Sequence, residues 1–169
     1  MANYDQHHQQ VGTQYNINID SSRSADTEAL LNQGIKFLEA KSYPQSISLF
    51  NEVIKADATI AVVYYYLALA LLKGRRPKIL KRSEVEEIDQ LLVSATTCGD
   101  SDATVHWFRV LVRDDYYGGN RMNCPPPSVQ SILASIQPNT TKLGRLRSLL
   151  VKLPMADNTL YSRLLKQTL

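Results

Sequence analysis

Two short amphipathic patterns joined at a proline constrain this chain most strongly. Apolar or small residues recur three and four positions apart on both sides of the joint, a spacing typical of helices with one buried face. They are Leu30, Leu31, Gly34, Phe37, Leu38 and Ala40 in the first pattern, and Ile47, Phe50, Val53 and Ile54 in the second. Pro44 suits a first helical turn, so it marks the start of the second helix. Neither helix buries its stripe alone, so the pair must pack against further helices.

The segment from Gly34 to Ala58 resembles a tetratricopeptide repeat. The residues that match the family's spacing of small and aromatic positions are Gly34, Phe37, Ser46 and Phe50. The departures from the family pattern are Leu30, Val53 and Ala58. A shift of about 34 residues, the length of one repeat, carries Gly34 onto Ala68, which is again small. The resemblance implies stacked helical hairpins that act as a scaffold for other proteins, and it does not identify the partner.

The rest of the chain predicts further helices. We therefore expect an all-α fold of about six to eight helices, arranged as tetratricopeptide-like hairpins. A polar tail is expected over residues 1–23, the helical domain over 24–137, and capping helices over 138–169. The last part holds two helical patterns, Leu143–Leu153 and Thr159–Leu169, separated by a proline.

The elements inside the helical domain are bounded by local signals. The first helix is expected to begin after Ser24 or Asp26, either of which can cap it. A third helix over 58–73 is apolar nearly all round, which predicts the most buried element. Ser83 with Glu86 predicts a capping box at the start of a fourth helix, and Asp100 or Ser101 starts a fifth. Glycines and prolines over 114–127 predict the largest loop, after which Ser128 caps a short helix.

The polar tail contains one segment, 14–20, that alternates like a β-strand. Tyr15, Ile17 and Ile19 would lie on one face of that strand. A single strand in a helical chain has no sheet to join. The open outcomes are disorder, pairing with a second copy of the chain, and pairing with the edge of a different protein. The QYNI sequence is similar to the N-termini of some bacterial signalling and conflict-system proteins, which implies a role in such an assembly.

Composition excludes a membrane span. No uncharged apolar run reaches the ~18–20 residues that a bilayer requires. Met1 is followed by polar residues, so no secretory signal is visible. The two cysteines, Cys98 and Cys124, are far apart, as expected for reduced thiols in the cytoplasm. We therefore expect a cytoplasmic protein.

A basic cluster between the third and fourth helices is the strongest local signal. Lys73 and the five residues Arg75, Arg76, Lys78, Lys81 and Arg82 place six positive charges within ten positions. Three interpretations stay open: contact with an acidic protein, contact with nucleic-acid phosphates, or a solvated loop neutralised by the acids that follow. Stacking aromatics are absent from this loop, which disfavours single-strand binding.

No motif points to catalysis, a metal or a cofactor. The chain has no phosphate-binding loop, and neither the cysteines nor the His7-His8 pair has the spacing of a metal site. An enzyme built around His106, Asp114 and Asp115 is the weakest alternative, because the acids are expected to hold the loop.

The sequence thus predicts a non-enzymatic protein–protein interaction adaptor, with nucleic-acid or anionic-surface binding as the alternative. A carboxylate clamp is disfavoured because the candidate groove residues on the first helix are apolar. The groove candidates are Leu31, Ile35, Leu38 and Tyr65. They predict either a hydrophobic groove or a face that another part of the chain covers. Self-assembly is expected through the N-terminal strand.

Overall fold

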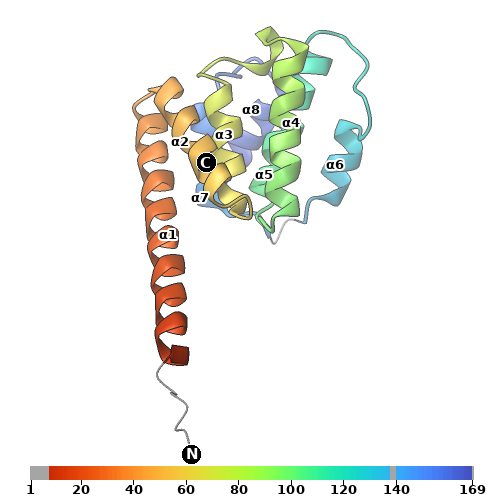
Figure 1. The fold of residues 1–169 in the computed structure, drawn as a ribbon. Helices are drawn as coiled ribbons and strands as arrows, with labels where there is room; N and C mark the ends of the chain where they lie inside the picture. Colours follow the sequence, from red (N-terminus) through yellow and green to blue (C-terminus); the bar gives the residue numbers. More distant parts are fainter. Residues whose placement is uncertain (1–7, 138–139, 169) are drawn as a thin grey trace, which may run out of the picture.

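The computed structural model describes the backbone of residues 8–137 and 140–168, with side chains from Ser24 onward, and every regular element in these ranges is helical (Figure 1). The α-helices are α1 (His8–Glu39), α2 (Tyr43–Ala56), α3 (Ala61–Leu71), α4 (Arg82–Thr97), α5 (Thr104–Arg113), α6 (Val129–Ser135), α7 (Leu143–Lys152) and α8 (Thr159–Thr168). A 3₁₀ turn, η1 (Pro77–Ile79), precedes α4, and a π-helical turn, η2 (Asp114–Gly118), follows α5. The all-α class is confirmed.

The prediction of a strand over 14–20 is wrong, because these residues belong to α1. This helix runs without a break from His8, well before the start expected near Asp26. A helix pairs its own backbone donors and acceptors, whereas a lone strand would leave them unpaired. Strand addition therefore has no strand to act through at the three positions named for it, which are Tyr15, Ile17 and Ile19. Residues 1–7 lie outside the described part.

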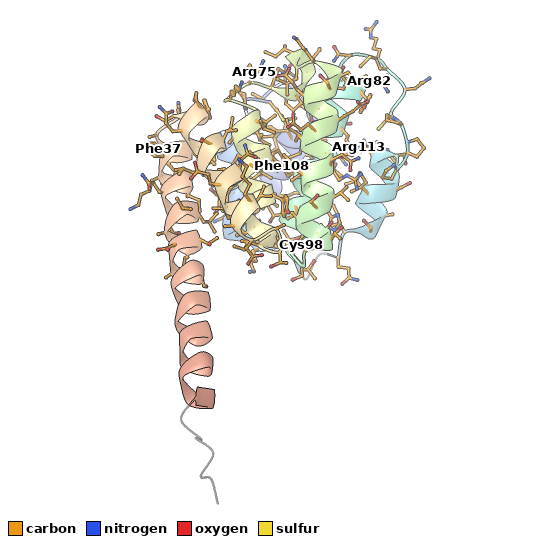
Figure 2. The ribbon with its side chains drawn as sticks, viewed as in Figure 1. Phe37, Arg75, Arg82, Cys98, Phe108 and Arg113 are labelled. Carbon is orange, nitrogen blue, oxygen red and sulfur yellow. The ribbon has the colours of Figure 1, made fainter. Side chains whose placement is uncertain are left out.

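Helices α1 and α2 form the hairpin predicted around Pro44. Their closest approach is at Gly34, where an added Cβ would lie 2.6 Å from Cε1 of Phe50. The Ser46 hydroxyl donates a hydrogen bond of 3.0 Å to the Gly34 carbonyl. Phe50 is fully buried, whereas Phe37 is half-buried on the side of α1 that faces away from the body (Figure 2). The small residue and the second aromatic thus join the two helices, and the first aromatic lies outside the core.

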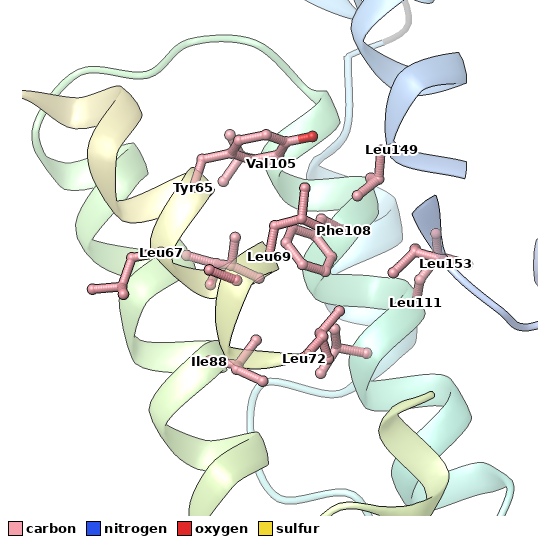
Figure 3. Packing of buried hydrophobic residues seen from close by; sticks show 14 of the residues in the cluster. Tyr65, Leu67, Leu69, Leu72, Ile88, Val105, Phe108, Leu111, Leu149 and Leu153 are labelled. Carbon is pink, nitrogen blue, oxygen red and sulfur yellow. The ribbon is translucent and has the colours of Figure 1, made fainter. Parts of the chain in front are cut away.

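The helices then pack largely in chain order. Helix α3 packs between α2 and α4, α4 packs against α5, and α7 packs against both α5 and α8. As its composition predicted, α3 is deeply buried, with Val63, Ala68 and Ala70 fully inaccessible to solvent. Figure 3 shows side chains of α3, α4, α5 and α7 meeting in one core, including Phe108 of α5 and Leu149 of α7. The C-terminal helices are therefore part of the core.

Some boundaries differ from the prediction. Helix α4 begins at Arg82, and the Glu84 carboxylate accepts a 2.8 Å bond from the Lys81 N–H, so the capping interaction lies two residues before the predicted box. The predicted loop over 114–127 starts with η2, which extends the α5 backbone by five residues. The Ser128 cap is confirmed by its bond of 3.1 Å from the Ser131 N–H.

Candidate protein-interaction groove

A hollow of about 660 Å³ lies where the C-terminal ends of α1, α3 and α7 meet. Its residues are Leu38, Glu39, Lys41, Tyr43, Leu69, Leu72, Lys73, Gly74, Val151, Lys152 and Pro154, which together we call the α1–α3–α7 groove. Three leucines, nearly buried, form an apolar floor. Three lysines form most of the charged rim, and Glu39 is the single acid among the lining residues. The groove thus combines apolar surface with a positive edge.

The turns that end α1 and α3 place two of these lysines. Lys41 has a φ of 60° and Lys73 a φ of 51°, the left-handed region that glycine favours. At the end of α1, the Ser42 N–H bonds the Phe37 carbonyl at 2.8 Å and the Lys41 N–H bonds the Leu38 carbonyl at 3.0 Å. This is the Schellman arrangement, with a lysine where glycine is usual. Each left-handed lysine costs about 1–2 kcal/mol relative to a relaxed conformation.

Tyr43 packs the first hairpin against the turn that follows α3. A Cβ added to Gly74 would lie 2.7 Å from the Tyr43 hydroxyl oxygen, and Gly74 has a φ of +67°. Glycine is therefore needed there twice, for its backbone conformation and for the close approach of the tyrosine. This contact forms one wall of the groove and holds Lys41 and Lys73 on adjacent turns.

A second, smaller hollow of about 80 Å³ lies along the seam between α7 and the faces of α1 and α3. Ile35, Leu38 and Tyr65 all line it, so the structure brings together three of the four predicted groove residues. Leu31 is half-buried against the core and lines neither hollow. Residues of α7 line both hollows beside those of α1 and α3. The hydrophobic groove and the covered face both stay predictions.

Arg145 holds α7 on this face. Its guanidinium carbon lies 4.0 Å from the centre of the Tyr65 ring, and its nitrogens pair with Asp100 at 2.8 Å and with Asp102 at 3.3 Å. Burial raises the pKa of Tyr65, so this hydroxyl stays neutral. Burial lowers the pKa of Arg145, but the hydrogen bonds to Asp100 together with the nearby charges of Asp100 and Asp102 give a net rise. Helix α7 is thereby tied both to α3 and to the turn before α5.

The arginines of the basic cluster are engaged within the protein. Arg75 pairs with Glu84 at 2.8 Å, and Arg82 pairs with Glu86 at 2.7 Å. Arg76 bridges Asp115 at 2.5 Å and Asp157 at 2.6 Å, and the hydrogen bonds that it donates to these two carboxylates raise its pKa. Three of the five predicted contact residues are therefore already ion-paired within the protein.

The two lysines of the cluster differ from its arginines. Within the described ranges, neither the Lys78 nor the Lys81 ammonium forms an ion pair, so these two charges stay available to an anionic partner of this loop. Binding of nucleic acid or an acidic surface here stays a prediction.

The acids of the enzyme alternative do line a hollow, of about 360 Å³, but their carboxylates are occupied. Asp115 is 1% exposed and accepts bonds from Arg76 and from the Lys78 N–H, at 2.9 Å for the latter. Asp114 accepts a bond of 2.9 Å from Asn158. His106 does not line this hollow, and burial followed by the charge of Arg109 lowers its pKa. The hollow thus brings Asp114 and Asp115 together without His106.

Several groove residues were missed by the sequence analysis. Lys152 and Val151 come from α7, more than seventy positions after the turn that carries Lys73, and no local pattern links them. The only sequence signal is that Val151, although apolar, lies off the buried face of α7, where the structure leaves it 82% exposed. A buried ion-pair group was also missed: Asp89 of α4 pairs with Arg109 at 2.7 Å and Arg113 at 2.8 Å.

Neither metal ligation nor membrane crossing finds support in the described ranges. Outside the masked positions, no three histidines, cysteines or acids gather where a metal ion could be held. Of the helices that the structure describes, none is long and apolar enough to span a bilayer. Comparison of the chain with protein-family models, with curated proteins and with solved structures gives no match.

Proposed function

We propose that this protein is a non-enzymatic adaptor that binds a segment of another protein in the α1–α3–α7 groove. The observation that carries the proposal is the groove itself, an open apolar floor surrounded by lysines. An apolar centre with a polar rim is the usual arrangement of protein–protein interfaces. Val151, 82% exposed at the mouth, is a large apolar side chain that a partner would cover.

The hairpin packing supports a tetratricopeptide-like scaffold for this groove. Gly34 permits the close contact of α1 with Phe50 of α2, and Ala68, about one repeat later, is fully buried in α3. Helix α3 then pairs with α4 as α1 pairs with α2. Such scaffolds present the inner face of the first helix of each pair, and residues of α1 and α3 line the groove together with Tyr43 of α2 and the end of α7.

The distribution of polar groups favours a protein segment over a small molecule. The volume lies within the range of about 300–1,000 Å³ that small-molecule sites occupy. Such sites, however, place a few polar groups inside the pocket to orient the ligand. Here the floor residues Leu38, Leu69 and Leu72 are all apolar, and the charges are at the rim on flexible side chains.

A site-specific crosslink tests this proposal. p-Benzoylphenylalanine replaces Val151, which is exposed enough to tolerate it, and the chain is irradiated in its source cells. The matched control carries the same residue in place of Ile79, which is 65% exposed on η1 and does not line the groove. We expect a defined heterologous adduct from position 151 alone. Adducts of the same mass from both positions, a chain-to-chain adduct, or none from position 151 would contradict the proposal.

A further inference from the structure

The charges and shape of the groove point to the chemistry of its partner. We propose that the α1–α3–α7 groove binds an acidic stretch within a partner chain, centred on one bulky apolar side chain. This inference rests on the proposed function and adds to it the class of sequence that the groove selects.

The rim supplies positive charge that the protein itself does not neutralise. Among the described residues, no ion pair engages the ammonium groups of Lys41, Lys73 or Lys152. This differs from Arg75, Arg76 and Arg82, each of which has a carboxylate partner. Lys152 donates a hydrogen bond of 2.9 Å to Ser148, which leaves its charge uncompensated. With Glu39 as the lone acid of the lining, the groove carries a net positive charge that complements carboxylates.

The placement of the lysines favours several carboxylates over one chain terminus. They come from three separate places in the fold: the α1–α2 turn, the turn after α3, and the end of α7. Recognition of one terminal carboxylate needs donors that converge on a point. A rim assembled from three elements suits an extended acidic stretch that crosses the groove, with side-chain carboxylates near each lysine.

The floor provides the second part of the recognition. Tyr43 and Val151 face the hollow across three leucines, and about 660 Å³ is enough room for an aromatic or leucine side chain. The hollow also continues toward the smaller one, because Leu38, Glu39, Leu69 and Lys152 line both. An apolar anchor would bury this surface, while the lysines would govern the association rate and its dependence on salt.

Selection of random peptides displayed on phage, using the full chain as bait, tests the inference. Enriched sequences are synthesised and titrated by fluorescence anisotropy against the wild type, a rim variant and a mouth variant. The rim variant carries Lys41→Gln, Lys73→Gln and Lys152→Gln, and the mouth variant is Val151→Asn. The control carries Lys55→Gln, Arg163→Gln and Lys166→Gln, which removes the same charge from exposed positions outside the groove. Circular dichroism confirms that each variant is folded.

We expect enriched peptides to hold several Asp or Glu residues around one Phe, Trp or Leu. The rim variant should bind them about tenfold more weakly, since three exposed charge pairs together contribute roughly one decade in affinity. The mouth variant should also bind about tenfold more weakly, because a valine side chain is no longer buried. The control should bind as the wild type does, and amidation of the peptide C-terminus should change nothing.

Other outcomes overturn the inference in distinguishable ways. Neutral peptides that the mouth variant weakens and the rim variant does not would refute the acidic partner and leave the groove as a docking site. Loss of binding on amidation would refute the internal stretch in favour of a terminal carboxylate. Failure of enrichment, or peptides indifferent to both variants, would refute the inference; joined to a failed crosslink at Val151, it would refute the adaptor as well.

Discussion

Replacing Gly34 by alanine should destabilise the protein, although alanine is the better helix former. In an exposed helix interior this change gains about 1 kcal/mol from backbone propensity. Here the new methyl group would lie 2.6 Å and 2.9 Å from two carbons of the Phe50 ring. That ring has no exposed surface and stacks on Tyr66 at a centroid distance of 6.0 Å, so it cannot move aside freely.

The overpacking cost should exceed the propensity gain. Extra atoms forced into a packed core cost about 1–3 kcal/mol, and the rigid ring places Gly34→Ala near the upper end. The net loss should be about 2 kcal/mol in the free energy of unfolding, measured by urea titration of the far-ultraviolet circular dichroism. Gly144→Ala is the matched control, because nothing lies within 4 Å of its added Cβ on α7. It should be neutral or stabilising.

A double variant isolates the steric contact. Gly34→Ala combined with Phe50→Leu should be more stable than the sum of the two single losses, because the smaller leucine leaves room for the methyl group. If Gly34→Ala matched the wild type or stabilised it as Gly144→Ala does, the close α1–α2 contact would be refuted. The tetratricopeptide-like packing proposed for this hairpin would then fail with it.

Three further predictions concern charged groups. Asp89→Asn should lower the free energy of unfolding by about 3–5 kcal/mol, measured by urea titration, because it leaves Arg109 and Arg113 facing a neutral amide in the interior; a loss near zero would contradict this. Asp115→Asn should lower the unfolding midpoint far more than Asp157→Asn does, since the first carboxylate is 1% exposed and the second side chain 69% exposed; equal losses would show that burial does not decide the strength of the Arg76 bridge. His106→Gln should reduce the loss of stability between pH 7 and pH 5. Burial lowers the pKa of His106, so the stability that this residue contributes is present above its unfolded pKa of about 6.5 and is lost on acidification. An unchanged difference between the unfolding midpoints at the two pH values would contradict this.

Local periodicity was enough to predict most helices. The stripes around Pro44, the apolar run of α3 and the patterns that became α7 and α8 each reveal a buried face within one or two turns. The Ser128 cap was predictable for the same reason, because it depends on a residue three positions away.

The failures arose where a distant contact, or its absence, decides the outcome. The alternation over 14–20 is a genuine strand pattern, but a strand needs a neighbour and this all-helical chain offers none among its described residues. The basic cluster was predicted to be available to a partner because its ion-pairing residues lie far away in the sequence: Asp115 is 39 positions from Arg76 and Asp157 is 81. The groove depends on where α7 returns to α1 and α3, which no local signal encodes.

The position of α7 also affects how the molecule is made. During synthesis α5 emerges before α7, and at about 5–20 residues per second the 39 positions from Arg113 to Lys152 take roughly 2–8 s. Over that interval Phe108 and Leu111 lack the leucines of α7 that later cover them. The nascent chain therefore exposes apolar side chains of α5 until its final helices have been made.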